Sequence, residues 1–302
     1  MGRRIAAGIL ILLLAGLGAL GFFLQQNRKK MIADPYQAVS PSAAIVIETS
    51  DPGTLLGTLT VTGGITGELA GIKEFSSLFN TLKYLHELSE KESLVRLFSG
   101  NRSVIAFYPA DQAKLTPFLS MVLPSDLNLR HIRDGLGNAG INGVVPLKQG
   151  KTKMLGIPYK DADDTDTLFL SVNSGLLLAG FSSEMVVTSR ARLSNPDDIR
   201  SAPGFQRVQQ ASGKNENKIF LIFDNLKGMS ERMFRSEKLK LADDVTKIAG
   251  SAGGEFILDE NGFAFSGYSE GSGSDEILDR FRDIDPVTLN TTEVLPASTV
   301  MF

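Results

Sequence analysis

One serine of this chain lies in the pentapeptide that serine hydrolases use to present a nucleophile. Gly267-Tyr268-Ser269-Glu270-Gly271 fits the pattern G-x-S-x-G. That pattern supplies a nucleophile where a strand turns sharply into a helix, and it needs a histidine as general base. Here a predicted strand leads into a Gly/Ser loop instead, and the two histidines of the chain are His86 and His131. A hydrolase that uses Ser269 with His86 or His131 is therefore the weakest of three functional hypotheses.

Four aspartates in one predicted loop offer oxygen ligands of the kind that calcium prefers. They are Asp161, Asp163, Asp164 and Asp166. A calcium loop of the helix–loop–helix kind also requires glycine at its sixth position and glutamate at its twelfth. Those positions hold Asp166 and Val172, so the pattern fails. We expect a solvated turn between two strands.

Composition excludes several other chemistries. The absence of cysteine rules out disulfides and thiolate catalysis, and two histidines cannot form a multi-histidine metal site. The dinucleotide pattern G-x-G-x-x-G occurs at 16–21 and at 135–140, but neither copy lies between a strand and a helix as that site requires. We therefore predict no catalytic residue, no metal and no cofactor, and we expect a protein that acts by binding.

The start of the chain predicts a membrane anchor. Ile5–Leu24 contains twenty consecutive uncharged, almost wholly apolar residues between basic residues at 3–4 and 28–30. A helix of that length spans about 30 Å, the thickness of a bilayer core. A cleaved signal peptide has a shorter apolar region and a small-residue cleavage site. Because this segment has neither, we expect residues 1–30 to be a retained, single-pass signal anchor whose partner is the lipid bilayer.

The short basic head before the anchor favours export of everything that follows, so we expect an extracytoplasmic, periplasmic body on a bacterial cell membrane. The chain has 302 residues and a net charge of −3. Five basic and no acidic residues lie in 1–30, which leaves the remainder at −8. An acidic body argues against nucleic acid as a partner, because phosphate recognition needs clustered lysine and arginine.

Hydrophobic periodicity divides the rest of the chain into a polar linker at 31–42 and one α+β domain at 43–290. Apolar residues spaced three and four apart predict a helix over 75–88. β-Branched runs separated by Gly, Asp and Asn predict short antiparallel strands, and Asn261-Gly262 predicts a hairpin. Strands are expected at 43–48, 103–108, 118–123, 144–147, 153–157, 167–172, 176–181, 218–223, 255–258 and 263–268, those over 144–181 as an antiparallel meander. Further helices are expected at 93–98, at 125–134 with Ser125 as its cap, and at 184–193 with a cap at 182–184. Asp51-Pro52 predicts the start of another helix, with Asp as the N-cap and Pro in the first helical position. The expected fold class is α+β, with a mostly antiparallel sheet.

The last residues resemble the beginning of the domain. Leu295–Phe302 and Ser40–Ile47 both contain a proline, three small residues and an apolar run. The chain also stops inside that run. We therefore expect 291–302 to begin a second repeat, in a chain truncated from a longer protein.

Several segments together resemble a bacterial family catalogued as domain of unknown function 3352. They are Pro41–Glu48, Gly100–Phe107, Leu176–Ser183, and Pro203–Val208 followed by Lys218–Phe223. The resemblance spans about residues 40–300 and implies one N-terminal transmembrane helix followed by a long exported region. It transfers no catalytic residue, since the family carries no known activity.

These observations favour a membrane-anchored envelope interaction or scaffold module. The alternative is a lipid- or peptide-binding module of the cell envelope, which would require a large apolar cavity between helix 75–88 and the sheet. The envelope hydrolase would require a histidine within hydrogen-bond reach of a serine.

Overall fold

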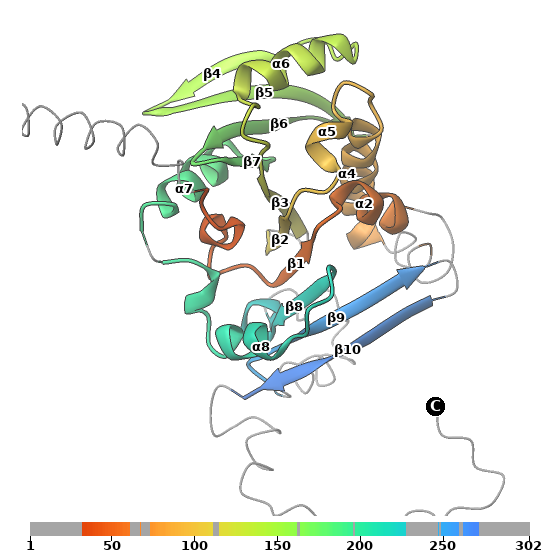
Figure 1. The fold of residues 1–302 in the computed structure, drawn as a ribbon, viewed down its shortest axis with the longest axis vertical. Helices are drawn as coiled ribbons and strands as arrows, with labels where there is room; N and C mark the ends of the chain where they lie inside the picture. Colours follow the sequence, from red (N-terminus) through yellow and green to blue (C-terminus); the bar gives the residue numbers. More distant parts are fainter. Residues whose placement is uncertain are drawn as a thin grey trace, which may run out of the picture.

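The computed structural model describes residues 32–60, 67, 73–110, 115–161, 164–195, 197–227, 247, 249–259 and 262–271 (Figure 1). Among these residues no helix is long and apolar enough to cross a bilayer. The predicted anchor Ile5–Leu24 and the predicted second repeat at 291–302 lie outside the described residues, so both stay predictions.

The fold is α+β, built on a ten-stranded antiparallel sheet, as the sequence predicts. The strands are β1 (Ile45–Thr49), β2 (Ser103–Pro109), β3 (Leu115–Val122), β4 (Val145–Gln149), β5 (Thr152–Asp161), β6 (Asp164–Asn173), β7 (Leu176–Gly180), β8 (Lys218–Ile222), β9 (Ser251–Asp259) and β10 (Gly262–Glu270). Their spatial order is β10-β9-β8-β1-β2-β3-β7-β6-β5-β4. The meander predicted over 144–181 is confirmed, because β4, β5, β6 and β7 pair consecutively. Figure 1 shows β4 at one end of the sheet and β10 at the other.

Both faces of the sheet are covered, which explains why its central strands are apolar on successive residues rather than on alternate ones. One face packs against α2 (Pro52–Thr60), α4 (Lys73–Ser89), α5 (Val95–Phe98) and α6 (Leu129–Asn138). The other packs against η1 (Pro35–Ala38), α7 (Ser183–Arg192), η3 (Ile199–Ser201) and α8 (Phe205–Ala211). All five residues of β7 are buried as a result.

Side-chain caps determine where the helices start. Ser182 caps α7 by accepting a hydrogen bond from the Met185 N–H, as the sequence suggests. α6 starts four residues later than predicted, because Asn128 rather than Ser125 accepts from the first free N–H groups. Caps satisfy donors that have no partner inside the helix.

The predicted linker at 31–42 is wrong for its described residues. Asp34 accepts a hydrogen bond from the Tyr36 N–H and so starts η1, which packs on the sheet. Tyr36, Ala38 and Val39 are completely buried. The polar residues and prolines of this segment suggested a spacer, but its few apolar residues are part of the core, so the domain begins by Asp34 rather than at residue 43.

Candidate functional site

The residues of the hydrolase hypothesis do not lie together. Ser269 is exposed on β10, the last strand of the sheet. His86 lies on α4, where its ring faces Gly57 of α2, and His131 is exposed on α6. In the part of the chain that the structure describes, neither histidine forms a hydrogen bond with Ser269.

The aspartate-rich loop joins β5 to β6, and the register pairs Asp161 with Asp164. Asp166 is exposed and accepts a hydrogen bond from the N–H of Thr167. The described residues contain no group of three or more His, Cys, Asp or Glu side chains that could hold a metal ion. Asp163 lies outside them.

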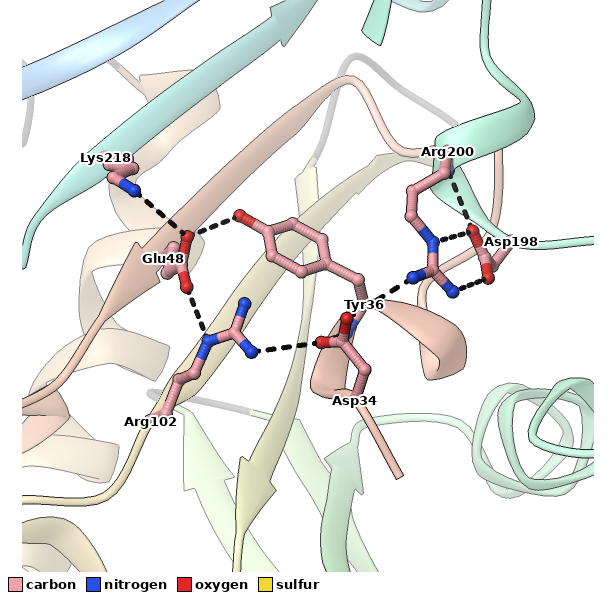
Figure 2. Close-up of polar contacts among 7 residues, drawn as sticks. All are labelled: Asp34, Tyr36, Glu48, Arg102, Asp198, Arg200 and Lys218. Carbon is pink, nitrogen blue, oxygen red and sulfur yellow. Dashed lines mark hydrogen bonds and ion pairs between the residues drawn. The ribbon is translucent and has the colours of Figure 1, made fainter. Parts of the chain in front are cut away.

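Seven polar residues from distant parts of the chain meet around Tyr36 (Figure 2). This set, here called the Tyr36 cluster, consists of Asp34, Tyr36, Glu48, Arg102, Asp198, Arg200 and Lys218. It joins the start of η1 to strands β1 and β8, to the residue before β2, and to the 3-10 helix η3. Its members lie up to 184 positions apart in the sequence, so no local motif predicts it.

The Glu48 carboxylate contacts three other members of the cluster: Tyr36, Arg102 and Lys218. Its Oε2 accepts from the Tyr36 hydroxyl at 2.9 Å, and its Oε1 accepts from Arg102 Nε at 2.6 Å. Lys218 Nζ lies 4.0 Å from Oε2. The Arg102 guanidinium also lies 5.6 Å from the centre of the Tyr36 ring, within the range of a cation–π contact.

Asp34 links the two arginines of the cluster. Its Oδ1 lies 3.4 Å from Arg102 Nη1, and its Oδ2 accepts from Arg200 Nη1 at 3.3 Å. Arg200 also donates to both carboxylate oxygens of Asp198, whose side chain is only 4% exposed. Bidentate pairs of this kind fix both position and orientation.

The Tyr36 cluster therefore contains three carboxylates and three cations, and every charge has an opposite partner. No unpaired charge is left for a substrate. We conclude that the cluster fastens η1 to the sheet.

Burial raises the pKa of three tyrosines, Tyr36, Tyr84 and Tyr108, and so favours their neutral form. Burial is the main cause that raises the pKa of Tyr36 above its ordinary value, and the Glu48 carboxylate raises it further. Burial likewise raises the pKa of Tyr108 to about 12, although the N–H of Ser40 donates to its hydroxyl at 2.9 Å and acts in the opposite direction.

Stability should consequently fall at alkaline pH. Between pH 10 and 12 the unfolded chain releases tyrosine protons that the folded chain retains, so unfolding becomes easier as the pH rises. The higher pKa of Tyr108 in the folded chain corresponds to roughly 3 kcal/mol of stability, present in full below pH 10. Urea denaturation of the wild-type chain and Tyr108→Phe across this range measures the difference. Equal pH slopes for the two chains would contradict the assignment.

The apolar cavity that the lipid- or peptide-binding alternative requires is small in this structure. It lies between α4, α5, α6 and the sheet, is lined only by apolar residues such as Leu85 and Leu177, and has a volume of about 30 Å³. That volume holds about one water molecule, whereas ligand sites measure roughly 300–1,000 Å³. The cavity does not hold an acyl chain in this conformation.

The two edges of the sheet differ in how they are protected. β4 is short and contains Pro146 and Lys148, residues that prevent another strand from pairing. β10 has nine residues, contains neither proline nor lysine, and pairs only with β9 among the described strands. Its Phe263, Phe265 and Tyr268 are 45%, 46% and 57% exposed. We call these three aromatic residues, together with the side of β10 that no described strand pairs with, the β10 edge.

The comparisons with known proteins provide little more. No protein-family model and no curated protein matches the chain. A solved structure titled "Structure of crystal form I of TP0453" matches 73% of this chain and 72% of its own, with 12% sequence identity and a TM-score of 0.37.

Proposed function

We propose that this chain is a membrane-anchored, extracytoplasmic interaction module that binds a partner protein along the β10 edge. The observation that carries the proposal is the exposed aromatic edge strand. Such an edge presents unpaired backbone N–H and C=O groups to an extended segment of another protein, and the side chains beside it provide specificity.

Two further observations support binding rather than catalysis. The charges of the Tyr36 cluster are paired internally, and Ser269 lies apart from both histidines. The proposed anchor Ile5–Leu24 would hold the module at the membrane surface. Membership of the domain of unknown function 3352 family forms part of the same proposal.

Phe265→Lys should abolish partner binding without unfolding the protein. An added strand would bury the lysine charge without a partner, which is how natural edge strands prevent pairing. We expect the co-purifying partner to decrease at least about tenfold. The measurement is affinity purification of the full chain from detergent-solubilised membranes, with mass spectrometry of the eluted proteins.

Ile257→Lys is the matched control, because Ile257 is 63% exposed but lies on β9, which pairs with β10 and is not itself the edge strand. It introduces the same charge on the neighbouring strand and should retain the partner. A partner that Phe265→Lys still binds would contradict the proposal, as would the absence of any stoichiometric protein partner.

A further inference from the structure

A groove at the opposite end of the sheet has the chemistry of an anion site. It lies between α6 and the β4–β5 hairpin and has a volume of about 620 Å³, within the range of ligand sites. Four basic residues line the groove: Arg130, Arg133, Lys148 and Lys153. The other lining residues are apolar: Leu129, Pro146, Leu147, Met154 and Leu155. No acidic residue lines it.

The charge of this region differs from that of the rest of the chain. Residues 129–153 contain five basic residues and one acid, a net charge of +4. The whole region after residue 30 has a net charge of −8, so positive charge is concentrated here on an acidic protein. A local positive field of this kind attracts anions even when the net charge is negative.

Lys148 and Lys153 are directly opposite each other on β4 and β5. Directly opposed residues share one face of the sheet, with their Cβ atoms about 5 Å apart, and like charges in that position are destabilising. No ion pair compensates either lysine in the part of the chain that the structure describes. Of the two arginines, Arg133 is the one that forms an ion pair among the described residues, with Asp134 at 3.3 Å. A bound anion would relieve this repulsion.

The shape and apolar content of the groove narrow the choice of anion. Leu129, Pro146 and Leu155 form an apolar surface beside the cations, which a free inorganic anion does not need. An acidic peptide could not add as a regular strand at this edge, since Pro146 has no N–H to donate. A phosphate joined to an apolar body satisfies both parts of the groove.

We propose that this groove binds the phosphate-bearing head group of an anionic lipid at the membrane surface. The cations contact the phosphate, and the apolar residues contact the glycerol end of the acyl chains. The site is separate from the β10 edge and does not depend on the function proposed for it.

The test uses the full chain in neutral detergent, titrated calorimetrically with short-chain phosphatidylglycerol and with phosphatidylcholine of the same acyl length. Phosphatidylglycerol should bind at least about tenfold more tightly, and salt should weaken its binding. The double variant Lys148→Gln/Lys153→Gln should lose at least about tenfold in affinity. Because the substitutions remove a like-charge pair, this variant should be at least as stable as the wild-type chain.

Lys91→Gln/Lys214→Gln is the matched control, since both lysines are exposed and lie outside the groove. It removes the same charge and should bind phosphatidylglycerol like the wild-type chain. Equal affinity for the two lipids would overturn the proposal. So would displacement of phosphatidylglycerol by equimolar inorganic phosphate, which would indicate a soluble anion, or by a polyglutamate peptide, which would indicate a protein partner.

Discussion

Replacing Tyr36 by alanine is expected to lower the free energy of unfolding by about 4 kcal/mol. The ring is completely buried and makes edge contacts with Phe205 at 5.9 Å and with Phe220 at 6.4 Å between ring centres. Its removal leaves a cavity among these rings. It also removes a hydrogen-bond donor from Glu48 and the aromatic face near Arg102.

Tyr36→Phe separates packing from hydrogen bonding, because it keeps the ring and removes only the hydroxyl. We expect a loss of about 1 kcal/mol, the usual value of one hydrogen bond. Urea denaturation of the full chain in neutral detergent, followed by far-UV circular dichroism, measures both changes. Tyr268→Ala is the control, since that side chain is 57% exposed. If Tyr36→Ala were as stable as this control, residues 32–42 would be a linker after all.

The error at 31–42 had a recognisable signal in the sequence. Asp51-Pro52 correctly predicts the start of α2, where the Thr54 N–H donates to Asp51 Oδ1 at 3.1 Å. Asp34-Pro35 is the same dipeptide, and it starts η1 in the same way. Asp34-Pro35 does not stand out as a helix start in the sequence, because the polar residues around it, after the predicted anchor, are typical of a spacer. A capping dipeptide is therefore evidence for folded structure even in a polar segment.

The strands were largely predictable because their signals are local. Turn residues and β-branched runs lie next to each other in the sequence, so the meander from β4 to β7 follows from them. The Tyr36 cluster was not predictable in this way. Glu48 meets Arg102 and Lys218 only because β1 pairs with both β2 and β8, and that pairing is a property of the whole sheet.

The basic groove between α6 and the β4–β5 hairpin was predictable from the sequence only in part. The hairpin is predictable, but the opposition of Lys148 and Lys153 requires the register, which the two residues Gly150 and Lys151 determine. The packing of α6 beside the hairpin adds Arg130 and Arg133, and a tertiary contact of this kind has no local signal.

The strand β9 begins at Ser251, four residues before the predicted start at residue 255. Gly253-Gly254 concealed the first half of the strand, because glycine is a poor strand former. The structure shows why glycine is present. A Cβ at residue 254 would collide with the Ser266 carbonyl and the Gly267 Cα of β10, and one at residue 253 would collide with the Phe220 ring.

Gly254→Ala should therefore destabilise the protein by about 3 kcal/mol, the upper range for overpacking. The colliding atoms belong to the β10 backbone, which cannot move aside as the end of a flexible side chain can. We expect β10 to separate from β9 and its amides to exchange faster with solvent. Hydrogen exchange of the full chain, resolved to the peptides of β9 and β10, measures this separation.

Gly137→Ala is the matched control, because the same substitution is expected to raise stability rather than lower it. Gly137 lies within α6, and a Cβ added there would meet nothing within 4 Å, so alanine should stabilise the helix by about 0.5–1 kcal/mol.

If Gly254→Ala kept wild-type stability and wild-type exchange in β10, the close approach of β9 and β10 would be incorrect. If it released β10 while the partner stayed bound, strand pairing would hold but the β10 edge would not be the binding surface. The two glycines thus test the sheet and its proposed interaction separately.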